Sequence, residues 1–236
     1  MPITVSTTPW GTFLVAPWDL VPAWIAQGKF WDPHIKPIYD KHINKNSVCL
    51  DVGAHCGFHS IYLSKLAKEI YAFEPQPVIY RQLCGNLFLN NCLNVHAFNL
   101  ALYDKECTME IAPQAQQVIP VPMCGSNVNY DACTNSAGVA LRPGAGSMKA
   151  ITLDSLNIPK VDFIKCDAQG ADLHVLMGGL ELIKRCRPII IFEYEAELIG
   201  INGDKLQDYS DFFFHKNNLN YEISKLDVRD HLCMPR

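Results

Sequence analysis

Short apolar runs alternate with longer segments of helical periodicity along most of this chain. The run at 188–192 is apolar throughout, as is typical of a parallel strand that is buried on both faces. Such alternation predicts an α/β fold: a doubly wound, mostly parallel sheet with helices on both faces. The predicted strands cover 47–52, 70–74, 95–100, 161–166 and 188–192, the predicted helices cover 58–68, 77–90, 171–185 and 205–217, and closing strands lie at 221–226 and in the C-terminal stretch.

Two stretches interrupt the alternation. Residues 1–46 form a lead-in that contains four tryptophans, and we expect it to pack on the core, with a lid over a cofactor as the alternative. Residues 107–152 form a loop-rich insertion, which is long for a plain connection and indicates a functional loop or a hairpin. No repeat or linker divides the chain, so we expect one domain over 1–236. In the lead-in, 11–16 predicts a strand and 17–29 and 33–42 have helical spacing; the β-like runs of the insertion are 109–111, 118–121 and 149–152.

The stretch from 47 to 74 carries the most specific chemical signal. An apolar run ends in Asp51, a glycine-bearing turn and a helix follow, and a second apolar run ends in Glu74. This order is the nucleotide-binding half of a doubly wound fold, in which the final acid can accept both hydroxyls of a ribose. The turn reads Gly53-Ala54-His55-Cys56-Gly57 and lacks the G-x-G-x-x-G cradle for a pyrophosphate. The pattern therefore favours an adenosine ligand without phosphates, and S-adenosylmethionine is the obvious candidate.

Acidic residues follow most of the predicted strands. Ligands of such sheets bind outside the carboxyl ends of the strands, so these residues are candidates for a site. A helix cap explains Asp51 or Asp167 taken singly, but it explains the repetition poorly. The candidate clusters are 51–57, Glu74, 99–102, 167–170 and 193–195.

Charge and cysteine usage exclude several classes of protein. A net charge of −4 gives no attraction to nucleic acid or to an anionic membrane. No apolar run reaches the ~20 residues of a membrane span, and the N-terminus does not resemble a signal peptide. None of the ten cysteines forms a C-x-x-C pair, so free buried thiols in a cytoplasmic protein are the simplest interpretation. Nothing sets the oligomeric state, and a homodimer is one option.

Five segments, taken in order, resemble the FkbM family of S-adenosylmethionine-dependent methyltransferases. The resemblance covers about 11–226, and five motifs in sequence are far more specific than any one of them. It implies a class I methyltransferase fold with a seven-stranded-type sheet, and O-methylation of a sugar, a glycan or another small hydroxylated molecule. The segments are VCLDVGAHCGFHSIYLSKLA, IYAFEPQPVIYRQLCGNLFLNN, ITLDSL, VDFIKCDAQGADLHVLMGGLELI and RPIIIFEY.

The resemblance also implies roles for particular residues. The first motif implies cofactor binding by the turn, with the Asp51 carboxylate holding the turn and the cofactor ammonium. The second motif implies that Glu74 binds the ribose. Asp167 matches a family acid that faces the methyl group. The implied cofactor-binding residues are Asp51, Gly53, Ala54, His55, Gly57, Glu74, Pro75, Asn99, Ala101 and Asp167.

Three positions depart from the family pattern. Gln169 and Asp172 stand where the family has glutamates, and His55 replaces a common asparagine. If the family acid at 169 is an essential base, glutamine cannot replace it; either it is not essential, another group acts, or the activity has changed. His55 is a candidate base, because histidine titrates near neutrality, or it hydrogen-bonds over the cofactor. For His59, one turn later, the structural role is the simpler interpretation.

Two mechanisms for the transfer remain open. In the first, Asp167 takes the proton of the acceptor hydroxyl as a base, with Lys165 or His55 nearby. In the second, Asp167 and Glu193 hold a divalent cation such as Mg²⁺, which lowers the pKa of the hydroxyl. A small-molecule or glycan acceptor is expected to contact the insertion, where Asn127, Asn129, Tyr130 and Arg142 are candidate contacts or ordinary loop residues.

Other functions fit parts of the pattern. A nicotinamide-dependent dehydrogenase shares the fold, but the turn lacks its glycine fingerprint. A non-catalytic protein that binds S-adenosylmethionine is the rival from another class, and Gln169 is its main support. A nucleic-acid methyltransferase is disfavoured by the acidic balance.

Overall fold

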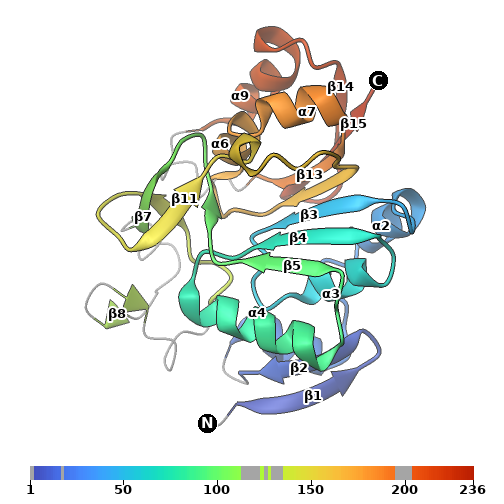
Figure 1. Cartoon of the computed structure of the whole chain (residues 1–236), viewed down its shortest axis with the longest axis vertical. Helices are drawn as coiled ribbons and strands as arrows, with labels where there is room; N and C mark the ends of the chain where they lie inside the picture. The colour runs from blue at the N-terminus through green and yellow to red at the C-terminus, as the bar shows by residue number, and fades with distance from the viewer. Residues whose placement is uncertain (1–2, 17–18, 113–122, 125–126, 129–134, 195–203) are drawn as a thin grey trace.

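A seven-stranded sheet forms the centre of the computed structural model (Figure 1). The structure describes residues 3–16, 19–112, 123–124, 127–128, 135–194 and 204–236. The strand order is β14-β15-β13-β12-β3-β4-β5, and only β15 runs antiparallel to its neighbours. The predicted doubly wound, mostly parallel sheet is therefore confirmed. Its strands are β3 (Val48–Val52), β4 (Glu69–Phe73), β5 (Val95–Phe98), β12 (Phe163–Cys166), β13 (Ile189–Glu193), β14 (Tyr221–Lys225) and β15 (Asp230–Pro235).

Helices cover both faces of this sheet, because alternate residues of the buried strands point to opposite sides. In β3, Cys49 belongs to one hydrophobic cluster and Leu50 to the other. On the first face lie α1 (Leu20–Ala26), α2 (Lys36–His42), α3 (Phe58–Ser64) and α4 (Pro77–Leu89). On the second face lie α6 (Asp172–Met177), α7 (Leu180–Cys186), α9 (Leu206–Ser210) and the π-helical turn η2 (Asp211–Lys216).

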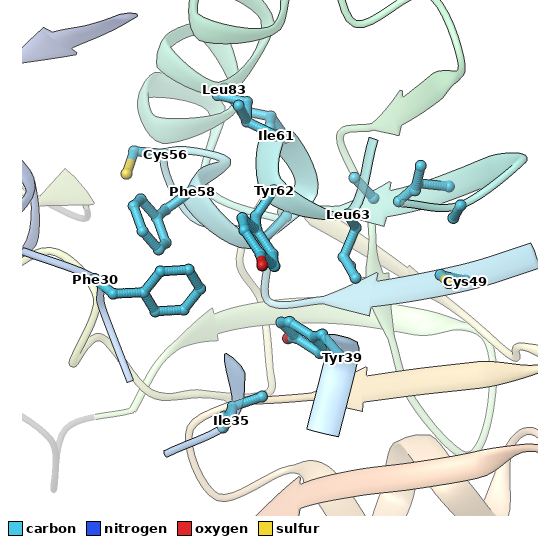
Figure 2. Packing of buried hydrophobic residues seen from close by; sticks show 14 of the residues in the cluster. Phe30, Ile35, Tyr39, Cys49, Cys56, Phe58, Ile61, Tyr62, Leu63 and Leu83 are labelled. Atoms are coloured by element: carbon cyan, nitrogen blue, oxygen red, sulfur yellow. The ribbon is translucent and has the colours of Figure 1, made fainter. Parts of the chain in front are cut away.

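Aromatic side chains join the lead-in to the first face of the sheet (Figure 2). Phe30 packs edge-on against Phe58 and Tyr62 of α3, with ring centroids 4.8 and 5.0 Å apart. Tyr39 of α2 is fully buried against Phe163 of β12. Edge-to-face pairs of this kind add about 0.5–1.5 kcal/mol beyond the burial of their area. The lead-in is therefore part of the hydrophobic core, as its packing interpretation predicted.

The hairpin of the lead-in consists of β1 (Thr4–Thr8) and β2 (Gly11–Val15). Polar side chains of α4 hydrogen-bond to the backbone of β2. Asn90 accepts a hydrogen bond from Thr12 N at 2.8 Å and donates one to Thr12 O at 2.7 Å. Asn86 accepts from Leu14 N at 2.7 Å, and Gln82 donates to Leu14 O at 2.9 Å. These three side chains are four residues apart, so they lie on one face of the helix. They bond the edge of β2 as a neighbouring strand would.

The predicted insertion contains more regular structure than a loop. A second sheet has the order β10-β7-β11-β6, and it packs its own small cluster around Met109 and Leu141. The β-like runs at 109–111 and 149–152 lie largely within β7 and β11, whereas 118–121 lies outside the described residues. The remaining elements are β6 (Ala101–Leu102), β7 (Cys107–Ile111), β8 (Met123–Cys124), β9 (Asn127–Val128), β10 (Leu141–Pro143), β11 (Met148–Ile151) and the 3-10 turn η1 (Asp154–Leu156).

The predicted helix over 171–185 is wrong as a continuous element. It is two helices, α6 and α7, with Gly178 and Gly179 between them. A Cβ atom at Gly178 would lie 2.1 Å from the carbonyl oxygen of Tyr103, so the close approach of that chain requires glycine. The helix predicted at 58–68 is also shorter, because α3 ends at Ser64. The helix predicted at 205–217 is present as α9, which η2 continues directly to Lys216.

Two expectations from composition can be compared with the described residues. No helix among them is long and apolar enough to cross a membrane. The cysteines among them whose side chains are described are free, as expected: Cys49, Cys56, Cys84, Cys92, Cys107, Cys166, Cys186 and Cys233.

We expect Asn86→Ala to lower the free energy of unfolding by about 2–4 kcal/mol. The side chain is fully buried, and its loss leaves Leu14 N and Cys56 O without their partners, each costing about 1–3 kcal/mol. Arg81→Ala, on the exposed side of the same helix, is the control and should stay within about 0.5 kcal/mol of the wild type. Urea unfolding measures both, and equal stability of the two variants would contradict the bracing role of Asn86.

Candidate active site

The carboxyl ends of the parallel strands open onto a cavity of about 850 Å³, counted with its mouth. Its wall is mostly apolar with a few polar and charged side chains, which is typical of small-molecule sites. The lead-in lines it with Val21 and Trp31, and the second sheet lines it with Met109 and Leu141. Trp10 instead packs on Phe30 and donates to Gly28 O at 2.9 Å, so Trp10 belongs to the core and Trp31 to the cavity wall.

The turn after β3 approaches the end of β12 so closely that no side chain fits at Gly53. A Cβ atom there would lie 1.9 Å from the carbonyl oxygen of Asp167. Gly53 and Gly57 have φ of +75° and +86°, which glycine adopts without strain. His55, between them, also has a positive φ of 49°. The turn thus presents its backbone and the His55 side chain to the cavity.

Glu74 follows β4 and is held from behind by main-chain donors. Its carboxylate accepts from His55 N at 3.0 Å and from Gln76 N at 2.8 Å. Burial raises the pKa of Glu74 to about 7, against the opposing effect of these two N–H groups. Asn99 donates to the carbonyl oxygens of Glu74 and Pro75, so it shapes this corner through the backbone. The acid therefore faces the cavity with oxygen lone pairs to spare.

A buried lysine in the cavity wall lies between two carboxylates. In the register of β3 and β12, Lys165 pairs with Asp51, and its ammonium lies 4.0 Å from Asp51 Oδ1 and 3.1 Å from Asp167 Oδ2. Burial alone would lower the pKa of Lys165, but the carboxylates of Asp167 and Asp51 outweigh it and raise that pKa well above its usual value. Lys165 is therefore a fixed cation and not a proton acceptor.

Asp51 lies deeper than the sequence motif suggests. Its side chain is fully buried and accepts a 2.5 Å hydrogen bond from Ser60 of α3. It is not in the cavity wall that the described residues form. In this geometry Asp51 holds α3 and Lys165, and the prediction that it binds a cofactor ammonium directly finds no support.

Asp167 remains ionised over the whole useful pH range. Burial opposes this, but the Lys165 ammonium and the donors around the carboxylate lower the pKa of Asp167 to about 2. Gln169 Nε2 donates to Asp167 Oδ1 at 2.9 Å and to Glu193 Oε2 at 2.8 Å. The amide thus joins two carboxylates that an acid at this position would repel.

The divalent-cation alternative finds no support in the same cluster. The Gln169 amide nitrogen lies between Asp167 and Glu193, where a cation would have to sit. The described residues contain no group of three or more acids, histidines or cysteines able to hold a metal ion. Asp172, the other departure, is structural: its carboxylate accepts from Ala168 N and Glu193 N at 3.1 and 3.2 Å.

The two histidines of the motif differ in their surroundings. Both ring nitrogens of His59 have partners, Tyr39 OH and Asp32 Oδ2, each at 3.3 Å, which supports its structural interpretation. His55 Nε2 lies 2.7 Å from Ser136 Oγ, whereas its Nδ1 is buried without a partner among the residues that the structure describes. Ser136 also bonds Asp19. Sequence reasoning missed Ser136 and Asp19, which are 117 residues apart and belong to no motif.

The predicted site residues divide into two groups. One group lines the cavity, and the other, Asp51, Gly57, Asn99 and Glu193, supports that wall in the described structure. Arg142 bonds Glu110 at 2.8 Å, which fits an ordinary structural residue, and Asn129 and Tyr130 lie outside the described residues. The first group is Gly53, Ala54, His55, Glu74, Pro75, Ala101, Lys165 and Asp167.

The model of the methyltransferase FkbM domain matches residues 51–223, from the end of β3 to β14. This chain belongs to the FkbM methyltransferase family. The match spans the whole arrangement of strand ends described above, so the resemblance in the sequence is confirmed.

Individual relatives are distant. Methyltransferase sdnD of Sordaria araneosa is 27% identical over 163 residues, which are 58% of this chain and 62% of that protein. The chain thus spans less than two thirds of this curated relative. Methyltransferase FkbM of Methylobacillus flagellatus has a TM-score of 0.52 at 13% identity, covering 90% of this chain and 52% of that one. SMU.1697c of Streptococcus mutans, solved with SAH, has a TM-score of 0.50 at 12% identity, covering 86% and 97%. These structures share the fold.

We expect Gly53→Ala to destabilise the protein by several kcal/mol, about 3 or more, and to deform the cavity. The new methyl group has no room beside Asp167 O, and the positive φ is unfavourable for alanine. Gly85→Ala is the matched control, because there the nearest atom is the mobile end of Leu14 and the site is helical. Thermal unfolding compares the two, and a Gly53→Ala protein as stable as the control would contradict the tight junction.

Proposed function

We propose that this protein is an S-adenosylmethionine-dependent O-methyltransferase that acts on a hydroxyl of a small molecule, with a carbohydrate or glycan as the preferred class. One observation carries the proposal: the Glu74 carboxylate, held by two main-chain N–H groups, faces a cavity at the strand ends beside a glycine turn. Family membership supports the reaction type. The similar fold from S. mutans, which contains SAH, agrees with the ligand class.

The residues present fit the cofactor. Glu74 is placed to accept both ribose hydroxyls, and Phe73, Pro75, Ala101 and Leu102 supply an apolar wall for an adenine ring. Gly53 lets the turn after β3 lie against the end of β12, so that the turn and Asp167 line the same cavity. When bound, S-adenosylmethionine supplies an activated methyl group, so the protein has mainly to align the acceptor.

Asp167 is best suited to hold the acceptor hydroxyl. Its side chain is 26% exposed toward the cavity and permanently ionised, so it can accept a hydrogen bond from a hydroxyl and orient the oxygen. A carboxylate with a pKa of about 2 is a weak base, which favours positioning over removal of the proton. Lys165 fixes the Asp167 carboxylate from below.

The cavity wall favours a neutral acceptor with hydroxyl groups. Among the described lining residues Lys165 is the only permanent cation, and Asp51 and Asp167 already neutralise it. A polyanionic acceptor such as a nucleic acid would find no free counter-charge in that part of the wall. Trp31 offers an aromatic surface, and Asp167 offers a hydrogen-bond acceptor. A sugar, with apolar faces and hydroxyl edges, suits both.

We expect the affinity for S-adenosylhomocysteine to weaken as the pH falls below 7. Glu74 must ionise to accept both ribose hydroxyls, and its pKa in the empty site is about 7, so the affinity should fall by up to about tenfold per pH unit. Glu74→Gln should bind weakly and without this pH dependence. Glu69→Gln, at the opposite end of β4, is the control and should behave as the wild type. Calorimetry from pH 5.5 to 8 measures this, and flat wild-type affinity would contradict it.

The reaction is tested by a screen of glycans and small alcohols with a labelled methyl donor. With the best acceptor, Asp167→Asn should lower kcat by about 100-fold or more, as for loss of an electrostatic contact to the reacting oxygen, with S-adenosylhomocysteine affinity within about threefold. Glu181→Gln, an exposed acid on α7, should keep full activity. Full turnover by Asp167→Asn would refute both its positioning role and the cation alternative.

The same measurements separate the rival functions. Binding of S-adenosylhomocysteine without any methyl transfer across the screen would favour the non-catalytic protein. Binding of NAD in place of S-adenosylhomocysteine would favour the dehydrogenase. Activity that survives a strong chelator would exclude the cation alternative.

A further inference from the structure

We propose that His55 is the base that takes the proton of the acceptor hydroxyl, and that Asp19 and Ser136 position it through a hydrogen-bond chain. The reaction step in this inference rests on the proposed function, whereas the hydrogen bonds among Asp19, Ser136 and His55 do not depend on it. This hydrogen-bond chain joins the lead-in, the segment that precedes β10, and the turn after β3.

Ser136 is the centre of the chain and is almost fully buried, as is Asp19. Ser136 N donates to Asp19 Oδ1 at 3.0 Å, and Ser136 Oγ donates to Asp19 Oδ2. On its other side Ser136 Oγ lies 2.7 Å from His55 Nε2. Gln76 Nε2 donates to the carbonyl oxygen of Ser136 at 3.2 Å and anchors the residue further.

This arrangement decides which ring nitrogen of His55 carries the proton. An ionised carboxylate only accepts hydrogen bonds, so the hydroxyl proton of Ser136 points to Asp19. Ser136 Oγ can then only accept from the imidazole, and Nε2 must be the protonated nitrogen. The lone pair of the neutral ring is therefore on Nδ1, which is buried and has no partner among the described residues.

The free Nδ1 belongs to a side chain of the cavity wall, where a proton acceptor is needed. The other titratable groups there are poorly suited. Asp167 is too weak a base, Lys165 is fixed as a cation, and Glu74 is assigned to the ribose. Both nitrogens of His59 are occupied. Burial raises the pKa of the Cys56 thiol, which also lines the wall, to about 12, so this thiol stays protonated. Among the described titratable side chains of the wall, His55 is therefore the one left to act as the base.

The charges around His55 keep the ring neutral at rest and stabilise the imidazolium that forms during the reaction. Burial lowers the pKa of His55, and the Lys165 ammonium acts in the same direction, whereas the carboxylates of Asp19 and Asp167 oppose them. Glu74 accepts the backbone N–H of His55. Since the pKa lies below the usual value near 6.5, the ring is a base at neutral pH. Once protonated, it is stabilised by Asp19 through Ser136 and by Asp167.

The proton balance of the step is simple. The acceptor O–H bond breaks, its proton goes to His55 Nδ1, and the oxygen electron pair forms the bond to the transferred methyl carbon while the electron pair of the broken C–S bond stays on sulfur. The imidazolium returns the proton to water when the products leave. No oxidant or further reactant is required.

The same three residue types occur in hydrolases, but here their order excludes that chemistry. In a hydrolase triad the histidine lies between the acid and the serine, and it receives the serine proton. Here the serine lies between, and its proton is committed to Asp19. Ser136 is therefore not a nucleophile but a positioning residue for His55.

The tautomer is tested by nuclear magnetic resonance on protein with ¹⁵N-labelled histidine, both ligand-free and saturated with S-adenosylhomocysteine. His55→Asn assigns the signals, and asparagine tolerates the positive φ of this position. We expect one protected proton on His55 Nε2 and none on Nδ1 at pH 7.5. Ser136→Ala should remove that protection, and Ser136→Thr, which keeps the hydroxyl, should restore it. Asp19→Asn should lower the pKa of His55, because a stabilising negative charge is lost.

A proton on Nδ1 in the wild type, or unchanged Nε2 protection in Ser136→Ala, would overturn the proposal whether or not the protein transfers methyl groups. In the turnover assay with the best acceptor of the screen, His55→Asn should lose about 100-fold or more in kcat with little change in S-adenosylhomocysteine affinity. Ser136→Ala should lose about tenfold, with rescue by Ser136→Thr. The control is His96→Gln on exposed β5. Wild-type kcat in His55→Asn would refute the base, whereas absence of turnover in the wild type would refute the proposed function alone.

Discussion

The ends of β3 and β12 meet so closely that the chain has no room for a side chain at Gly53. This contact, between the Gly53 Cα and the carbonyl oxygen of Asp167, sets the position of the turn after β3 and of the acid after β12. Everything else in the cavity is placed relative to these two strand ends. The turn directs His55 N to Glu74, and the register of the same strands puts Lys165 opposite Asp51. In the same register Cys166 pairs with Val52, so Asp167, the next residue, lies beside the turn after β3.

Burial and neighbouring charges then give the acidic side chains around the cavity different pKa values and different positions. Asp51 and Asp167 both face Lys165, but only Asp167 reaches the cavity wall. No cation among the described residues pairs with Glu74, and burial raises the pKa of Glu74 to about 7, while Lys165 helps to lower the pKa of Asp167 to about 2. Environments that separate the pKa values of neighbouring acids are typical of functional sites, because each acid is then suited to one task. Gln169 fits this scheme as a donor that links Asp167 with Glu193 without adding charge.

The lead-in and the insertion supply apolar walls for the cavity at the strand ends. Alone, the strand ends would form an open edge, with the cofactor region exposed to water. Val21 and Trp31 from one segment, and Met109 and Leu141 from the other, close the cavity with apolar side chains. The contact of Asp19 with Ser136 joins the two segments directly above the turn. Apolar walls strengthen the hydrogen bonds inside a cavity, because they lower the local dielectric constant.

The sequence by itself determined the order of the main strands, the two faces of the sheet and most of the acids at the strand ends, because periodicity and turn chemistry are local properties. It also determined that 53 and 57 are glycines in a tight turn. Only the tertiary structure decided that Asp51 is buried behind the described cavity wall and bonds Ser60, that Gly178 divides a predicted helix, and that Ser136 meets Asp19 and His55. These outcomes depend on contacts between residues far apart in the chain, such as Asp19 and Ser136. No spacing or composition encodes such a distance, since it exists only once both segments pack on the same sheet.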